Sequence, residues 1–241
     1  MAFACAMLMV ASASAQTAYR DDARGWSTTL PPGWVIGPDS LVERANAELH
    51  KRMPDPRFAF IGAFVLSEPP ADAGDVPYVL VQFNAIPLRG LTYEEISKGM
   101  GVDFSASAQK TISDKFSDIV KSAAFDQAIF DRALNRYVLT SRVQVDGAAP
   151  SRTLSTGYLT AAGVVQFNCY APEATYPQYE GGFTAIIDGV RIDAGRVFLA
   201  ADPSVRLAKT FNNTTAYIVI GAFVGLLVAG VFKVVRIVRN R

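Results

Sequence analysis

The side chains with the most obvious catalytic chemistry in this chain are one thiol and one imidazole. Cys169 is the only cysteine after residue 15, and it shares a predicted strand face with Val165 and Phe167. That setting predicts a buried, inert thiol rather than a nucleophile or an intermolecular disulfide. His50 is the only histidine. It lies off the apolar stripe of a predicted helix, so we expect a solvated surface residue.

Neither residue has the companions that catalysis requires. A Ser-His-Asp or Cys-His enzyme would need His50 as its base, and the sequence has no Gly-x-Ser-x-Gly turn to present a serine. Ser107 and Lys110 have the Ser-x-x-Lys spacing of penicillin-recognising enzymes, but the Ser-Asp-Asn and Lys-Thr-Gly motifs of those enzymes are missing. No catalytic residue is therefore predicted.

Carboxylate pairs are the remaining candidates for acid–base chemistry or for binding a hard cation. We interpret them as helix starts and solvated faces: Glu94 with Glu95, and Asp188 with Asp193. Two Cys and one His leave too few ligands for a structural zinc site, and no glycine-rich phosphate loop is present. The sequence thus predicts neither a metal site nor a cofactor.

The composition describes a globular protein of 241 residues, half of them apolar, with 23 Lys plus Arg against 22 Asp plus Glu. These figures exclude collagen and wholesale disorder. Four basic residues and no acidic ones follow residue 232, so the rest of the chain is slightly acidic. Nothing in this charge distribution indicates nucleic-acid binding.

The apolar residues concentrate at the two ends of the chain. Residues 1–15 form a short apolar stretch that ends in Ala-x-Ala spacing, which predicts a signal peptide cleaved after Ala15. No basic residue precedes the apolar stretch, so an uncleaved anchor or a buried N-terminal helix remains an alternative.

The other end predicts a transmembrane helix over residues 211–233. Its apolar run, 216–232, spans roughly 25 Å as a helix, and the flanking residues extend it to the ~30 Å of a bilayer core. The basic segment 234–241 places the C-terminus in the cytoplasm by the positive-inside rule. We therefore expect a single-pass protein of the cell (inner) membrane, with residues 16–210 as a globular domain outside the cytoplasm.

Within the predicted span, Gly221, Gly225 and Ala229 lie four residues apart on one helix face. This small-xxx-small pattern lets two transmembrane helices approach closely. It would serve a homodimer or a membrane-protein partner. The alternative is that Gly and Ala are simply common in membrane spans.

Periodicity within residues 16–210 predicts strands interrupted by helices and then a run of antiparallel strands. A strand over 26–36 is broken at Pro31–Gly33, and a strand over 57–66 is apolar on both faces and expected to be central. The further strands are expected at 78–86, 125–133, 137–145, 153–161, 164–170 and 196–200, and the helices from residue 39, from the Thr92–Glu95 capping box, over 105–122 and from Pro177. The predicted class is α+β, a layered α-β-α sandwich with a mainly antiparallel sheet, plus the C-terminal transmembrane helix.

Three features of this order resemble the PsbP-like family over about residues 26–192. They are the Leu30-Pro31-Pro32-Gly33-Trp34 turn, the mid-chain helix, and the meander with Arg136-Tyr137-Val138-Leu139, Gly157-Tyr158-Leu159-Thr160 and Gly163-Val164-Val165-Gln166-Phe167. The family includes extrinsic proteins of photosystem II, a yeast Ran-binding protein and many exported bacterial proteins. The resemblance implies a non-enzymatic accessory or binding domain, and it carries no site residue across.

The leading hypothesis is a membrane-anchored, non-enzymatic interaction or assembly module. The alternative is a domain that binds or senses a small molecule or a lipid at the membrane surface, with a cavity lined by aromatic residues (Trp26, Trp34, Phe64, Tyr78 and Tyr158). A third reading, a carboxylate-based hydrolase, requires two acids that face each other in a cleft. A filled core would favour the first hypothesis, and a roomy cavity with converging polar groups the second.

Overall fold

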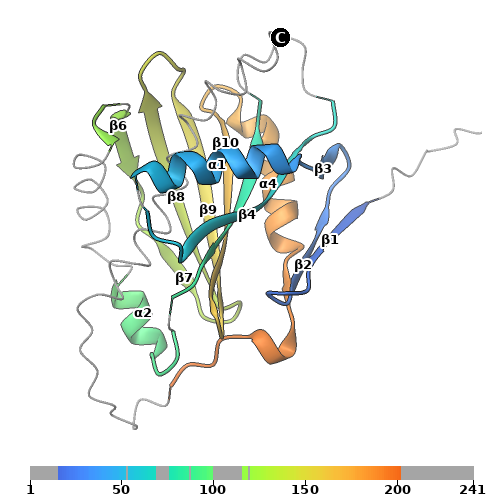
Figure 1. Ribbon diagram of the computed structural model, residues 1–241, viewed down its shortest axis with the longest axis vertical. Coiled ribbons are helices and arrows are strands. Elements are labelled where there is room, and N and C mark those ends of the chain that lie inside the picture. Colours follow the sequence, from blue (N-terminus) through green and yellow to red (C-terminus); the bar gives the residue numbers. More distant parts are fainter. Residues whose placement is uncertain are drawn as a thin grey trace, which may run out of the picture.

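The computed structural model describes residues 16–52, 54–68, 76–86, 88–99, 116–118 and 120–201, which form an α+β fold (Figure 1). This class agrees with the prediction. The helices are α1 (Asp39–Arg52), α2 (Tyr93–Gly99) and α4 (Tyr176–Asp188), with a 3₁₀ turn at Ala194–Arg196. The strands are β1 (Thr17–Asp21), β2 (Trp26–Leu30), β3 (Trp34–Ile36), β4 (Phe58–Leu66), β5 (Tyr78–Asn84), β6 (Val120–Phe125), β7 (Ile129–Asp131), β8 (Arg136–Val145), β9 (Ser151–Thr160), β10 (Gly163–Pro172) and β11 (Arg191–Ile192).

The larger sheet has eight strands in the order β3-β4-β5-β10-β9-β8-β6, with β7 also paired to β8. Every neighbouring pair in it is antiparallel. The predicted meander is confirmed as β8-β9-β10. Its last strand pairs with β5, so the early β4-β5 pair and the late meander form one surface.

The predicted break at Pro31–Gly33 separates two sheets. β2 joins β1 and β11 in a three-stranded sheet, whereas β3 is the edge of the larger sheet. Gly33 has φ +82°, a conformation that glycine adopts without steric cost. This turn lets the segment 26–36 contribute one strand to each of the two sheets.

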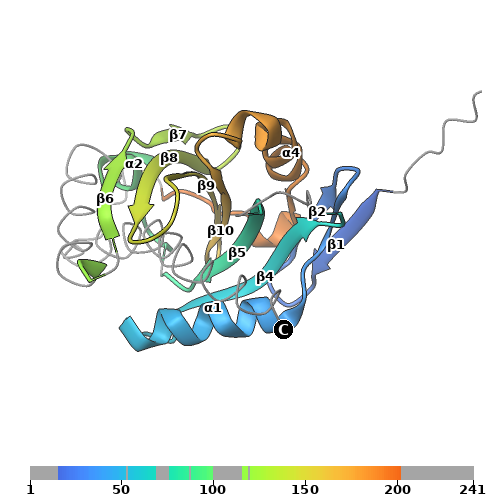
Figure 2. The same ribbon diagram turned by 90° about the horizontal axis from the view of Figure 1, so that it is seen from above.

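Helices cover both faces of the larger sheet, since α1 and α4 lie on opposite sides of it (Figure 2). The α1-side cluster joins Leu41, Ala45 and Leu49 of the helix to Phe58, Phe60, Tyr78, Leu80, Leu139, Val143 and Tyr170. The α4-side cluster joins Phe183, Ile186 and Ile187 to Trp26, Trp34, Phe64, Val79, Val81, Val165 and Phe167. A third group, the α2-side cluster, contains Ile86, Leu88, Leu91, Ile96, Leu159, Val164 and Phe198.

Strand β4 differs in two ways from its prediction. It is covered on both faces as expected, but it lies next to the edge strand β3 rather than at the centre of the sheet. A register shift between Phe60 and Gly62 inserts an extra residue. Because side chains alternate along a strand, this bulge turns Phe64 to the α4 side while Phe58 and Phe60 face α1.

Three other predicted elements need correction. The helix expected over 105–122 falls mostly outside the described residues. From Val120 the chain forms strand β6, which pairs with β8. Its alternating residues Ala123 and Phe125 pack toward the α1-side cluster. The strand expected over 125–133 is divided into β6 and the short β7. The strand expected over 196–200 is replaced by the 3₁₀ turn and one bridge between Val197 and Thr160, where Phe198 turns into the α2-side cluster.

Within the described residues, no helix combines the length and the apolar character needed to cross a bilayer. The predicted signal peptide, with its cleavage site after Ala15, and the predicted span 211–233 lie outside those residues.

Candidate functional site

The structure places the predicted thiol and imidazole in different settings. Cys169 is fully buried in the α4-side cluster with Val165 and Phe167, as predicted, and burial raises the pKa of its thiol. His50 is exposed on α1, also as predicted, and its Nε2 lies 3.3 Å from the carbonyl oxygen of Phe58. A protonated thiol inside the core and a distant surface imidazole on α1 do not form a nucleophile–base pair.

Three of the four candidate carboxylates, those of Glu95, Asp188 and Asp193, have structural partners. The capping box at α2 is confirmed: the backbone N–H of Thr92 donates to Glu95 Oε2 at 2.7 Å, and that of Glu95 donates to Thr92 Oγ1 at 3.2 Å. Asp188 accepts from Arg136 and Asp193 accepts from Arg20, so each acid of the second pair is bound to a different arginine. Among the described residues no group of three or more His, Cys, Asp or Glu is placed to hold a metal ion.

Several predicted positions lie outside the described residues: Ser107, Lys110, Gly221, Gly225 and Ala229. The five aromatic residues of the alternative hypothesis are all described and all buried. They do not form one lining, because Tyr78 belongs to the α1-side cluster and the other four belong to the α4-side cluster. The rings of Trp26 and Tyr158 both make edge contacts with Phe167, at centroid distances of 5.2 and 6.0 Å, as rings in a packed core do.

A group of buried amide side chains, which the sequence analysis missed, lies on the α1-facing side of strands β5 and β10. Gln82 pairs directly with Gln166 across the two strands, and both are fully buried. Gln82 Nε2 donates to Asn84 Oδ1 at 2.6 Å, and Gln166 Nε2 donates to Asn168 Oδ1 at 2.8 Å, so each glutamine repeats the same bond two residues along its strand. We call these four residues the amide ring.

The sequence holds a signal for this group. The tetrapeptide Val-Gln-Phe-Asn occurs at residues 81–84 and again at 165–168, and the antiparallel pairing brings the two copies face to face. In a buried strand an amide needs hydrogen-bond partners. Two identical polar interruptions in apolar strands therefore mark side chains that need buried polar partners, and the pairing of β5 with β10 decides which partners they meet.

Of the two equivalent amide hydrogen bonds that could join β5 to β10 within the amide ring, one is made. Asn84 Nδ2 donates to Gln166 Oε1 at 3.2 Å, whereas the symmetry-related atoms, Asn168 Nδ2 and Gln82 Oε1, have no hydrogen-bond partner among the described residues. Ser155 Oγ donates to Asn168 Oδ1 at 2.8 Å. This extra bond holds the Asn168 amide on the β9 side of the ring.

Tyr137 adds a further donor to the amide ring. Its hydroxyl donates to Gln166 Oε1 at 2.8 Å, and burial raises its pKa, so the proton stays on the oxygen. The tyrosine ring lies over Gly157, where a Cβ would overlap it. Gly157 thus lets Tyr137 reach the amide ring.

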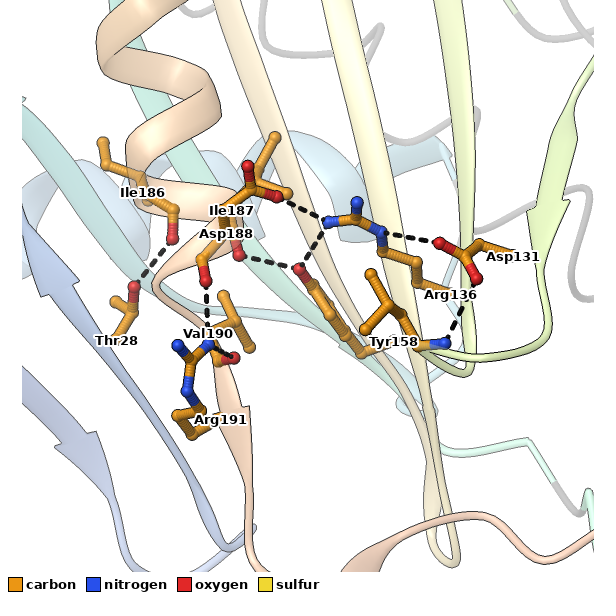
Figure 3. A network of polar contacts seen from close by, with 10 residues as sticks. Thr28, Asp131, Arg136, Tyr158, Ile186, Ile187, Asp188, Val190 and Arg191 are labelled. Carbon is orange, nitrogen blue, oxygen red and sulfur yellow. Dashed lines mark hydrogen bonds and ion pairs between the residues drawn. The ribbon is translucent and has the colours of Figure 1, made fainter.

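A second polar network holds the C-terminal end of α4 (Figure 3). The last carbonyl groups of a helix lack partners within the helix. Here side chains from β2, β9 and β11 supply donors: Thr28 Oγ1 to Ile186 O at 2.8 Å, Tyr158 OH to Ile187 O at 2.7 Å, and Arg191 Nη1 to Asp188 O at 2.7 Å. We call these contacts the α4 clamp.

Arg136 of β8 joins the α4 clamp to the edge of the sheet. Its Nη1 donates to Asp188 Oδ1 at 2.9 Å and to Tyr158 OH at 3.3 Å, and its Nε lies 3.9 Å from Asp131 Oδ2 (Figure 3). Burial raises the pKa of Tyr158, which remains a donor. A cation at the negative end of the helix dipole is favourable, so the clamp fixes α4 on the sheet.

No family model matches the chain, and no curated protein matches it. Similar solved structures exist. One is the cyanobacterial PsbP (CyanoP) from Synechocystis sp. PCC 6803, with 13% identity, TM-score 0.44, and coverage of 79% of this chain and 98% of that chain. A second is the Ran-binding protein Mog1p from Saccharomyces cerevisiae, with 9% identity, TM-score 0.41, and coverage of 74% and 96%. A third is LpqN of Mycobacterium tuberculosis, described as involved in cell envelope biogenesis, with 13% identity, TM-score 0.38, and coverage of 76% and 87%.

These neighbours have the PsbP/Mog1 fold. The resemblance read from the sequence is matched by solved structures. At such identities and TM-scores the likeness transfers no residue role and no activity to this chain.

Proposed function

We propose that this protein is a single-pass component of the cell (inner) membrane whose exported domain is a non-enzymatic interaction or assembly module. In this proposal residues 1–15 are a signal peptide, 16–210 form a layered α-β-α domain outside the cytoplasm, 211–233 cross the membrane, and 234–241 are cytoplasmic. Gly221, Gly225 and Ala229 would pack against a membrane-protein partner or a second copy.

One observation carries the proposal beyond the sequence: exposed apolar side chains border the α2-side cluster. Leu199, Ile129 and Leu134 are 82%, 69% and 52% exposed. The residue next to each of them in the chain contacts Tyr93. The rings of Phe130 and Phe198 both lie 5.7 Å from the Tyr93 ring, centroid to centroid, and Tyr93 OH donates to Asn135 Oδ1 at 2.5 Å. Grouped exposed apolar residues are typical of protein interaction sites.

The position of this end relative to the proposed anchor supports the same conclusion. Ala201 is the last described residue before the predicted span, and its N–H donates to the carbonyl of Leu91 beside α2. Residues 202–210 reach at most ~32 Å when fully extended. The end of the domain that carries Leu199 would therefore stand close to the membrane, within reach of another membrane protein.

The packing of the aromatic residues favours this function over the ligand-sensing alternative. Trp26, Trp34, Phe64 and Tyr158 all belong to the α4-side cluster. The rings of Trp26 and Tyr158 pack edge-on against Phe167, and such ring-to-ring packing favours recognition at the surface over a ligand held between the rings. The setting of Cys169 and His50, described above, supports a non-enzymatic role.

A pull-down of the full-length protein in mild detergent tests the proposal. We compare the wild type with a Gly221→Leu/Gly225→Leu variant and with a Leu199→Ser variant. Ile36→Ser is the matched control, because Ile36 is 49% exposed on β3, an edge strand of the larger sheet that does not contribute to the α2-side cluster. A stoichiometric partner that is lost in either test variant and retained in the control supports an assembly role.

Three results would contradict the proposal. Recovery of the protein alone in every sample would shift the function to ligand sensing. Release of the protein from membranes by alkaline carbonate would contradict the membrane anchor. A C-terminal fluorescent fusion that reports an extracytoplasmic C-terminus would contradict the proposed orientation.

A further inference from the structure

Two arginines face each other on the sheet surface next to the N-terminal end of α4. Arg142 of β8 and Arg152 of β9 are direct cross-strand partners. Both lie on the α4-facing side, because Arg142 alternates with Leu139 and Val143 of the α1-side cluster and Arg152 lies over the ring of Tyr176. Like charges directly opposite each other destabilise a strand pair unless something lies between them.

Among the described residues, Glu173 supplies a carboxylate to Arg142. Arg142 Nε lies 3.0 Å from Glu173 Oε1, and the backbone N–H of Glu173 donates to the carbonyl of Pro150 at 2.9 Å, which fixes the acid at the end of β10. Arg152 has its guanidinium carbon 4.5 Å from the centroid of the Tyr176 ring. Its Nε is buried and has no hydrogen-bond partner within the described part of the chain.

The two ends of α4 offer a direct comparison. At the C-terminal end, Arg136 and Tyr158 are also cross-strand partners of β8 and β9, and the arginine is neutralised by Asp188 at the negative end of the helix dipole. At the N-terminal end, the first turn of α4 contains no acidic residue. Glu180, the carboxylate one turn further on, is exposed.

We propose that Arg142 and Arg152 bind an oxyanion of the phosphate class, carried by a small ligand or by a lipid headgroup. Guanidinium groups present planar pairs of donors that match phosphate oxygens. The Tyr176 ring orients the Arg152 guanidinium in advance, which lowers the entropic cost of binding. An anion between the two guanidinium groups would place negative charge beside both arginines, whereas Glu173 places it beside Arg142. This site goes beyond the proposed assembly role and does not depend on the membrane anchor.

The test uses the full-length protein in a neutral detergent, titrated with inorganic phosphate at constant ionic strength. Calorimetry gives the affinity, and NMR of the arginine Nε–Hε groups reports which side chains respond. Arg152→Gln and Arg142→Gln should each weaken binding roughly tenfold or more, because each removes one charged donor pair. Arg20→Gln is the matched control, since it removes the same charge from an arginine paired with Asp193 on the small sheet.

A change of opposite sign sharpens the test. Glu173→Gln should tighten phosphate binding several-fold, because the carboxylate that competes for Arg142 is gone. Glu48→Gln on α1, where the acid pairs with Lys51, should have little effect. Arg142 and Glu173 are partly exposed, so these two variants remain informative even if Arg152→Gln fails to fold.

A second arm distinguishes the two sources of the phosphate group. Binding to phosphatidylglycerol nanodiscs but not to phosphatidylcholine nanodiscs, lost in Arg152→Gln, would assign the site to a lipid headgroup. Binding of inorganic phosphate with no lipid preference would assign it to a soluble ligand. The proposal is overturned if neither probe binds the wild type, or if Arg20→Gln weakens binding as much as Arg152→Gln does.

Discussion

Replacing Gln166 with leucine should destabilise the domain far more than the same replacement at Gln82. The two glutamines are fully buried, face each other across β5 and β10, and have identical side chains. Within the described part of the chain, the side chain of Gln82 makes one hydrogen bond, to Asn84, while that of Gln166 accepts from Asn84 and Tyr137 and donates to Asn168. Because the side-chain change is the same, the gain from burying leucine cancels in the comparison.

The expected magnitude follows from the groups left without partners. Gln166→Leu strands two buried donors, Asn84 Nδ2 and the Tyr137 hydroxyl, while Asn168 Oδ1 keeps its bond from Ser155. Each stranded group costs about 1–3 kcal/mol. Gln82→Leu strands Asn84 Oδ1 but also removes an oxygen that has no partner among the described residues, so its two effects nearly cancel. The difference in the free energy of unfolding should be roughly 2–6 kcal/mol.

Urea unfolding of the full-length protein in detergent, followed by tryptophan fluorescence, measures this difference. The chain has two tryptophans, Trp26 and Trp34, and both are buried in the domain. Equal destabilisation by the two replacements, or a larger effect at Gln82, would refute the hydrogen-bond assignment of the amide ring.

Three further predictions follow from the other contacts. Gly157→Ala should cost roughly 1–4 kcal/mol in unfolding experiments, because the new methyl group displaces the Tyr137 ring; an unchanged midpoint would contradict the overlap. Tyr158→Phe should cost about 1 kcal/mol by leaving a helix-end carbonyl unbonded, and Asp188→Asn less, since its ion pair is partly exposed; the reverse order would argue against the α4 clamp. Burial raises the pKa of Cys169, so above about pH 8.5 the unfolded thiol releases a proton that the folded thiol keeps, and stability should fall with rising pH. The native thiol should also resist alkylation at pH 8, and Cys169→Ala should flatten the pH profile between 8 and 9.5; rapid native alkylation would contradict the burial.

Local patterns predicted much of the fold. Period-two alternation and glycine turns located β8, β9 and β10, and the capping box located the start of α2. These features depend on residues close together in the chain, so their physical cause is visible in the sequence. The burial of Cys169 and the exposure of His50 followed from the same periodicity.

Errors arose where distant segments decide the outcome. The bulge in β4 reverses the direction of Phe64, and only pairing with β5 sets its position. The segment from Val120 becomes a strand because β8 offers a free partner there, and no local preference of the chain requires it. The residues around Val197 end in one bridge because Phe198 is drawn into a cluster built from five other segments.

The candidate sites divide in the same way. By itself the sequence determined the α+β class, the order of the meander and the inert settings of its single thiol and imidazole, because these follow from local periodicity and composition. Only the tertiary structure decided that Gln82 faces Gln166, that Arg142 faces Arg152, and that Arg136 meets the end of α4. Each of these contacts joins residues from different strands or helices, and register and packing, which depend on the whole chain, determine which side chains meet.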